Sequence, residues 1–227
     1  MDVAALGLSL RLAGWTTGLL LVLGLPLAHW LATTRWRWKF LVEALVALPL
    51  VLPPTVLGFY LLLALGPRGP LGPGFEWLVG HPLPFSFEGL LVGSLFYSLP
   101  FAVQPFTAAL RGVDWRLVEA SWCLGVSRAR TFVRVVLPLA APGIVSGMVL
   151  TFAHTLGEFG VVLMLGGNLE GRTRTASIAI YDAVQGLDYA AAGRTSLVLL
   201  GVSFAVLALT YGQGARRPGG GAPWPRS

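Results

Sequence analysis

Two ionisable side chains lie inside a long apolar stretch of the sequence. Glu158 and His154 belong to the segment TFAHTLGEFGVVLML, in which apolar residues predominate. An ionisable residue within a membrane-spanning segment faces other helices or a water-filled cavity, and it is a functional candidate by default. The two residues are four positions apart, the spacing at which side chains meet on one face of a helix. Together with Thr151 and Thr155 they form a candidate polar cluster.

Three kinds of site could use such a cluster. A metal site would need more ligands than one histidine and one glutamate, so we expect no bound metal. A proton relay stays open, but it would need a second acid in the membrane to pass the proton onward. The interpretation that we favour is a structural polar cluster near an external gate. Protonation or hydrogen bonds would then neutralise Glu158, because an unpaired buried charge is costly.

The sequence contains none of the common catalytic signatures. It has no phosphate-binding loop of the form G-x-x-x-x-G-K-[ST], no H-E-x-x-H and no C-x-x-C. Its single cysteine excludes an internal disulfide. We therefore expect no catalytic residue, no cofactor and no ATPase site of its own.

The composition indicates an integral membrane protein. Of the 227 residues, 55% are hydrophobic and 11% are charged, whereas an ordinary soluble domain has about 25% charged residues. The net charge of +6 could suggest nucleic acid as a partner of a soluble protein. Here the basic residues gather in loops between apolar runs, so membrane sidedness explains them better.

The apolar runs predict a single all-α membrane domain at 1–212 with five spans. We expect these spans at about 12–32, 40–65, 85–109, 142–166 and 194–212, followed by a disordered tail at 213–227. The loops after the first and third spans, together with the C-terminal tail, carry eleven of the sixteen basic residues. The positive-inside rule then places the N-terminus outside and the C-terminus in the cytoplasm. The Gly- and Pro-rich loop at 66–84 is expected to be irregular and external.

The second span contains Pro49, Pro53 and Pro54. A proline inside a membrane helix removes a backbone hydrogen bond, which other groups must replace. A broken helix lining a pathway and a plain structural kink both fit this pattern. The kink is the interpretation that we favour.

A basic segment, 119–138, lies between the third and fourth spans, within a loop at 111–140. Each arginine at the centre of a spanning helix costs about 2.5 to 3.5 kcal/mol, so Arg128, Arg130 and Arg134 must lie outside the hydrocarbon. We expect a short helix at 115–124, a turn at Gly125 and a second basic helix that Pro138 stops.

The segment also resembles the cytoplasmic loop of permease subunits of binding-protein-dependent ABC importers. That family's loop reads E-A-A, three residues, G, nine residues, I, one residue, L-P. The matching positions here are Glu119, Ala120, Ser121, Gly125, Val135, Leu137 and Pro138. Every spacing holds, with Ser for Ala and Val for Ile as the departures. The resemblance implies the type I importer permease fold and a loop that docks onto a cytoplasmic ATPase subunit.

Further motifs resemble the molybdate permeases within that family. They are Leu48 to Val56 followed by Gly58, Leu156 to Gly160, and the loop elements Gly167-Asn168, Gly171-Arg172-Thr173, Thr175 and Ala179 to Tyr181. The resemblance implies a homodimer in the inner membrane, with two ATPase subunits and one extracytoplasmic molybdate-binding protein, that imports molybdate and tungstate. A sulfate or other oxyanion permease is the near alternative, and a membrane assembly protein that transports nothing is the distant one.

Under this resemblance, polar residues of the second to fourth spans become candidates for the translocation pathway or its gate. They are Pro53, Pro54, Thr55, Ser98, Thr151, His154, Thr155 and Glu158. A carboxylate would repel an anionic substrate, so Glu158 is expected to belong to a gate rather than to bind the anion.

Overall fold

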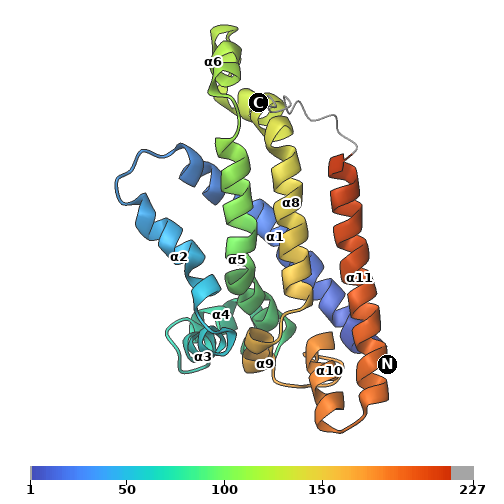
Figure 1. Cartoon of the computed structure of the whole chain (residues 1–227). Helices are drawn as coiled ribbons and strands as arrows, with labels where there is room; N and C mark the ends of the chain where they lie inside the picture. The colour runs from blue at the N-terminus through green and yellow to red at the C-terminus, as the bar shows by residue number, and fades with distance from the viewer. Residues whose placement is uncertain (1, 216–227) are drawn as a thin grey trace.

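The structure is a computed structural model that describes residues 2–215. Over these residues every regular element is a helix (Figure 1). Four helices are long and apolar enough to cross a membrane, and a bent pair makes a fifth crossing if it counts as one span. The expected all-α membrane architecture with about five spans is thus confirmed. The expected tail at 213–227 falls mostly on residues 216–227, which lie outside the described residues.

Three long helices form the centre of the bundle: α1 (Val3–Thr33), α5 (Phe87–Arg111) and α8 (Leu137–Leu156). Each of the three packs against the other two, and α1 crosses the pair obliquely (Figure 1). Their shared core centres on the fully buried Phe106. Other buried members of this core are Leu20, Ala28, Leu31, Ala102, Val103, Leu110, Ala140 and Ile144.

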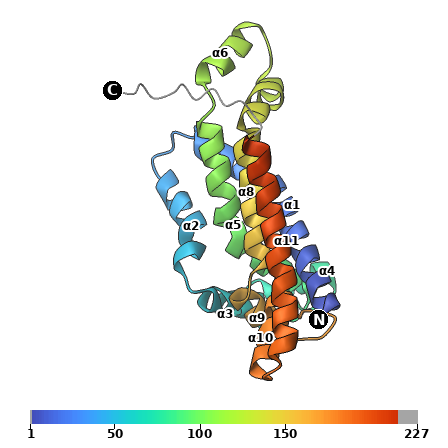
Figure 2. The ribbon, with the colours of Figure 1, turned by 45° about the vertical axis from the view of Figure 1, so that its right-hand side comes forward.

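The last helix, α11 (Tyr189–Ala215), runs along α8 at the edge of the bundle (Figure 2). Its membrane-length part is only 11% buried. Leu197, Leu200 and Phe204 are each about 70% exposed, so this helix presents a mostly apolar surface to the surroundings of the chain.

Glycines allow α5 and α8 to approach closely. A Cβ atom at Gly147 would lie 2.8 Å from the Phe106 ring, and one at Gly143 would lie 2.5 Å from the Cβ of Ala109. Real side chains do not tolerate such distances. The two glycines therefore set how near α8 comes to α5.

The second apolar run is two helices rather than one. Helices α2 (Lys39–Val51) and α3 (Pro54–Leu65) meet at an angle of 114°. Pro53 and Pro54 have no backbone N–H and Pro53 adopts extended backbone angles, so α2 cannot continue through them. The favoured interpretation of 40–65 as a kinked single span needs correction to a broken one. The loop at 66–84 is not wholly irregular either, because it contains α4 (Gly72–Val79).

The expected fourth span at 142–166 also needs correction. The membrane-length helix here runs from Arg128 to Leu156, and the apolar stretch breaks after Leu156. The short helix α9 (Gly160–Gly166) follows the break, and α10 (Ala176–Gln185) follows α9. Gly157 ends α8, and Phe159 has non-helical angles at the start of α9. Composition hid this break, because residues on both sides of it are apolar.

Pro138 does not stop a helix, contrary to the expectation. The chain passes from α7 (Arg128–Thr131) through a π-helical turn, η1 (Phe132–Val136), directly into α8. Pro138 lies in the first turn of α8, where its missing N–H is tolerated. In the π turn just before it, the Leu137 N–H bonds to the Phe132 carbonyl, so the helix continues through this position with an altered hydrogen-bond pattern.

The two ends of the bundle differ in character. At one end, here called the α6 end, α6 (Trp115–Cys123) projects beyond the spans, and the α1–α2 loop lies at the same end, level with the end of α5 (Figure 1). The opposite α10 end holds α3, α4, α9, α10 and the N-terminus. There the Ala176 backbone N–H donates to the Ser9 hydroxyl at 2.8 Å, and Arg174 lies 4.0 Å from Asp2. These contacts tie the first helix to a loop late in the chain.

We predict that Gly147→Ala destabilises the protein. The new methyl group would press on the Phe106 ring, and overpacking of this kind costs roughly 1–3 kcal/mol. Thermal unfolding of the purified protein measures the effect as a lower midpoint. The matched control is Gly18→Ala, at an exposed position of α1 where an added Cβ meets nothing within 4 Å. Equal midpoints for both variants would contradict the close α5–α8 contact.

Candidate functional site

Two serines on α5 join this helix to the end of α8. Ser94 donates a hydrogen bond from its hydroxyl to Glu158 Oε2 at 2.7 Å. Ser98, one helical turn further along α5, lies 3.0 Å from His154 Nδ1 and 2.8 Å from the Thr155 hydroxyl. The serines repeat at four residues, as His154 and Glu158 do. The predicted polar cluster therefore exists. Its hydrogen bonds, from Ser94 and from Ser98, connect α5 to the C-terminal end of α8.

Glu158 lies in the break between α8 and α9 rather than on a helix. Its side chain is buried, at 4% exposure. Oε2 has the Ser94 hydrogen bond, while Oε1 has no hydrogen-bond partner among the described residues. His154 and Glu158 do not bond to each other as the helical spacing predicted, because α8 ends between them and each binds a different serine.

The His154 ring lies between aromatic side chains of α5. It stacks on Phe101, with ring centroids 3.8 Å apart and an angle of 22° between the planes. The Tyr97 ring also packs against His154, with the two ring centroids 4.7 Å apart. With Nδ1 bonded to Ser98, these contacts fix the orientation of the imidazole.

A cavity of about 410 Å³ opens beside this cluster. Its lining residues are Pro54, Thr55, Tyr97, His154, Gly157, Glu158, Phe159 and Gly160. The break between α2 and α3 thus meets the break between α8 and α9 at one cavity. Within residues 2–215 no group of three potential metal ligands occurs, here or elsewhere.

The remaining predicted pathway residues lie behind this cavity or beside it. Ser98 and Thr155 are buried within the α5–α8 contact. Thr151 is buried one turn away and donates to the Gly147 carbonyl. Pro53 is exposed at the α2–α3 bend. The structure therefore brings Pro54, Thr55, His154 and Glu158 to the cavity, but it does not place the other four on the wall.

Close packing of α3 on α9 holds the two breaks together. A Cβ at Gly160 would lie 2.6 Å from the Cβ of Pro54, and one at Gly58 would lie 2.7 Å from the Cβ of Met164. Larger residues at either glycine would push the helices apart. The sequence elements at 48–58 and 156–160, far apart in the chain, are in direct contact.

At the α6 end, the basic segment at 119–138, which resembles an ATPase-docking loop, has the expected helix and turn. Asp114 caps α6, its side chain accepting from the Arg116 N–H at 2.9 Å. The chain turns at Gly125, whose φ of +76° suits glycine. The expected helix at 115–124 and the turn at Gly125 are thus confirmed.

Within this segment the predicted residues divide into an exposed and a packed set. Glu119, Ala120, Gly125 and Pro138 are exposed, Val135 and Leu137 are half-buried, and Ser121 is buried. The Ser121 hydroxyl lies 2.9 Å from that of Thr131, so it joins α6 to α7. The Arg128 guanidinium lies 5.5 Å from the centre of the Trp122 ring across the same junction. Because α7 leads through η1 into α8, α6 is attached to the end of that spanning helix.

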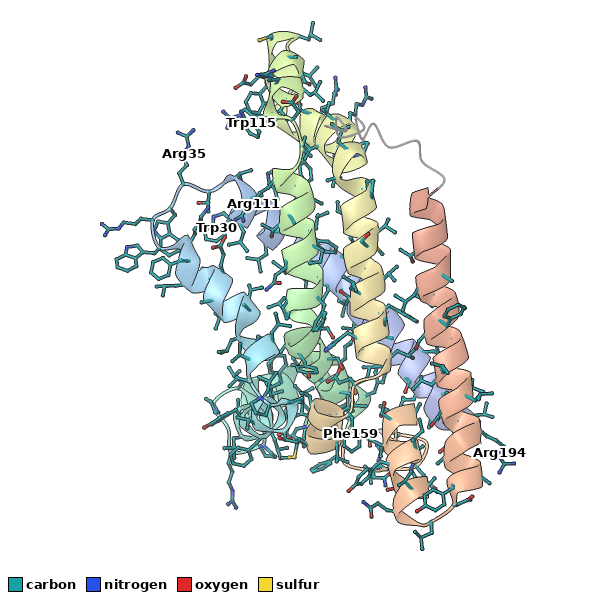
Figure 3. The ribbon with its side chains drawn as sticks, in the orientation of Figure 1. Trp30, Arg35, Arg111, Trp115, Phe159 and Arg194 are labelled. Carbon is teal, nitrogen blue, oxygen red and sulfur yellow. The ribbon has the colours of Figure 1, made fainter. Side chains whose placement is uncertain are left out.

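Sequence reasoning missed three contributors to the polar cluster: Ser94 as the partner of Glu158, and Tyr97 and Phe159 as walls of the cavity. Figure 3 shows Phe159 at the lower end of α8, beside α9. A signal for Ser94 was present, since Ser94 and Ser98 repeat the spacing of His154 and Glu158. This spacing predicts the Ser94–Glu158 contact only if α5 and α8 are known to be neighbours.

Comparisons with known proteins agree on one class of protein. The family described as binding-protein-dependent transport system inner membrane component matches residues 21–214. A molybdenum transport system permease protein, ModB, from Azotobacter vinelandii is 51% identical over 210 residues, covering 92% of this chain and 93% of the relative. ModB of Escherichia coli strain K12 is 36% identical, covering 89% and 88%. A probable molybdenum ABC transporter permease protein of Haloferax volcanii is 40% identical, covering 88% and 69%.

Solved structures show the same fold. A bacterial ABC transporter that imports the polysaccharide alginate aligns with a TM-score of 0.74 at 18% identity, over 95% of this chain and 79% of that one. The inward-facing MetNI methionine ABC transporter aligns with a TM-score of 0.72 at 19% identity, over 96% and 97%. At such identities the likeness concerns the fold, and it confirms the expected type I importer architecture.

We predict that Glu158→Leu lowers the thermal midpoint while Glu158→Gln leaves it nearly unchanged. Leucine would leave the buried Ser94 hydroxyl without its partner, which costs about 1–3 kcal/mol. Glutamine keeps an oxygen that can accept this hydrogen bond. The double variant Ser94→Ala/Glu158→Leu should recover much of the loss, since it removes both partners. A double variant no more stable than Glu158→Leu would argue against the hydrogen bond as the cause.

Proposed function

We propose that this chain, which belongs to the family of binding-protein-dependent transport system inner membrane components, is the membrane-spanning subunit of an ATP-driven importer of molybdate. The observation that carries the proposal is its 51% identity, over nine-tenths of both chains, to a molybdenum transport permease. Tungstate is a similar tetrahedral dianion, and we infer that the importer carries it as well.

The protein is a multi-pass protein of the inner membrane, and we assign residues 1–212 to a single permease domain. We infer an N-terminus outside and a C-terminus in the cytoplasm. The α6 end, which carries Arg35, Arg37, Lys39, Arg128, Arg130 and Arg134, then faces the cytoplasm. The α10 end would face outward.

The energy for transport must come from a separate subunit, because the sequence has no phosphate-binding loop. We infer a complex of two copies of this chain, two cytoplasmic ABC ATPase subunits and one extracytoplasmic molybdate-binding protein. The permease itself needs no cofactor and catalyses no reaction in this assignment.

The geometry supports a direct route from the ATPase to the polar cluster. The exposed face of α6, with Glu119 and Ala120, is available to a cytoplasmic partner. A push on α6 passes to α7 through the Ser121–Thr131 contact. The continuous helix from Arg128 to Leu156 then carries it to the break that holds Glu158. Movement at the α6 end would thereby shift the walls of the cavity near the α10 end.

We assign that cavity, with Thr55, His154 and Glu158 on its wall, to the external gate of the pathway. Glu158 acts there as a structural element that Ser94 holds in place, because a carboxylate aimed at the substrate would repel a dianion. The hydroxyl of Thr55 is uncharged and can donate a hydrogen bond. Because it is exposed at the start of α3, it is better suited to contact the anion as it passes.

Uptake of labelled molybdate by starved cells with and without the gene tests the proposal. We expect gene-dependent uptake that excess tungstate blocks and excess sulfate does not. Equal inhibition by sulfate would assign the chain to a broader class of oxyanion importers. Absence of gene-dependent uptake would remove molybdate as the substrate, and failure to co-purify with any ATPase subunit would favour a membrane protein without a transport role.

We predict that Glu119→Lys abolishes molybdate uptake while the protein still inserts into the membrane. Glu119 is exposed on α6, so the substitution leaves the packing of the chain intact but reverses a charge at the inferred ATPase contact. Uptake and ATP hydrolysis by the purified complex are measured together, and hydrolysis should become independent of molybdate. The control is Glu76→Lys, the same charge reversal on α4 at the opposite end. Unchanged uptake by Glu119→Lys would remove the coupling role of this residue.

A further inference from the structure

A cavity of about 380 Å³ lies at the α6 end, beside the first turn of α6. It is bounded by the end of α1, the α1–α2 loop, the end of α5 and the first turn of α6. Its lining includes His29, Ala32, Arg35, Arg111, Trp115 and Val118. Figure 3 shows Arg35 on the loop and Trp115 on α6 on either side of the space above Arg111. The transport mechanism proposed above makes no use of this cavity.

The rim of the cavity is positively charged. Arg35 and Arg111 line it and no acidic side chain does. Arg111 is held in place, since its Nη2 lies 2.7 Å from Glu43 Oε1 and 3.2 Å from the Leu31 carbonyl oxygen. Glu43 offsets part of its charge from outside the cavity. Arg35 is exposed, and within residues 2–215 no acidic group lies at ion-pair distance from it.

The floor of the cavity is apolar. Ala32, Leu110, Val118 and Val136 contribute aliphatic side chains, and His29 adds a ring that packs 4.6 Å from Phe132. A small soluble anion prefers a site lined by several hydrogen-bond donors. A cationic rim above an apolar floor suits instead a ligand with an anionic head and a hydrocarbon body.

Aromatic side chains place this cavity at the membrane surface. Trp30 near the end of α1 and Trp36 and Trp38 on the adjoining loop are all exposed, and Trp30 and Trp36 pack with ring centroids 6.1 Å apart. Tryptophan gathers at the level of the lipid headgroups. In the orientation proposed above this is the cytoplasmic leaflet, which carries the anionic lipids.

We propose that this cavity binds the headgroup of an anionic phospholipid. The phosphate pairs with Arg35, Arg111 adds a fixed positive charge, and the lipid body covers the apolar floor. Basic pockets between spanning helices on the cytoplasmic side are a recurrent kind of site for such headgroups. The inference rests on the proposed function for its membrane sidedness.

A lipid in this position would stabilise the position of α6. The contacts of α6 with other helices are mainly with α7 and η1, and the cavity separates α6 from the end of α1. A headgroup that touches Trp115 and Val118 on one side and Ala32 on the other bridges that gap. The efficiency with which ATP hydrolysis drives uptake should therefore depend on anionic lipid.

The test uses the complete permease–ATPase complex and compares two arginines of the same loop. Arg35→Gln removes one of the two cations that line the cavity, the one expected to pair with the phosphate. Arg37→Gln makes the same change two residues away, where the guanidinium lies 5.0 Å from the centre of the Trp38 ring and does not line the cavity. Native mass spectrometry measures the retention of phosphatidylglycerol relative to phosphatidylcholine in both complexes and in the unmodified one.

We expect retention of phosphatidylglycerol to fall about fivefold in Arg35→Gln, as for the loss of one cation near a membrane surface, and to stay unchanged in Arg37→Gln. Equal losses of phosphatidylglycerol in both variants would show that general surface charge causes the retention, and this would refute the proposed site. Retention unchanged in both would overturn it as well. Displacement of the lipid by millimolar inorganic phosphate or molybdate would identify a site for a soluble anion instead.

A second measurement separates this inference from the proposed function. Molybdate-stimulated ATP hydrolysis is compared in bilayer discs of phosphatidylcholine with and without phosphatidylglycerol, with the binding protein present. We expect stronger stimulation with phosphatidylglycerol, and loss of this difference in Arg35→Gln but not in Arg37→Gln. Absence of molybdate stimulation in every lipid would refute the proposed function. Stimulation that is equal in both lipids would refute the lipid site alone.

Discussion

A break in a membrane helix exposes backbone N–H and C=O groups that lipid cannot satisfy, so broken segments persist only where protein or water surrounds them. This chain has two such breaks, at Pro53 and after Leu156, and it packs them against each other. The contact depends on Gly160, which leaves room for Pro54. Ser94 secures the second break by its hydrogen bond to Glu158. The cavity at the α10 end, and with it any pathway through this region, exists because the two irregular segments are neighbours.

The same helix that ends at this break begins at the opposite face of the bundle. From Arg128 to Leu156 it runs without interruption, apart from the π turn at Phe132–Val136. Arginine side chains surround its first turns, and apolar ones follow. One continuous element therefore connects the segment that resembles an ATPase contact with the polar cluster. The short helix α6 is attached to this element through the Ser121–Thr131 contact. Ser121 stands at a position where the family loop has alanine.

Composition and spacing alone predicted the membrane class, the approximate spans, the short helix with its turn at Gly125, and the polar character of the group around Glu158. These follow from local hydropathy, charge and glycine chemistry. The break after Leu156 could not be predicted in this way, because apolar residues continue on both sides and glycine is common in membrane helices. The prediction that Pro138 ends a helix was wrong for a related reason, because the chain continues from the π turn into α8 through this proline. The partners of Glu158 and Pro54 depend on which helices are neighbours, which one sequence does not reveal.

The hydrogen bond from Ala176 to Ser9 joins residues 167 positions apart. At about 5–20 residues per second, a ribosome needs on the order of 10 to 30 seconds to make the chain between them. During that interval α1 has entered the membrane, but the backbone N–H that its buried serine will accept from does not yet exist. The first helix to be made thus receives one of its buried contacts only late in synthesis. Biogenesis of this protein must shelter the polar side of α1 until the loop before α10 has been translated, which gives the insertion machinery a defined time over which to hold it.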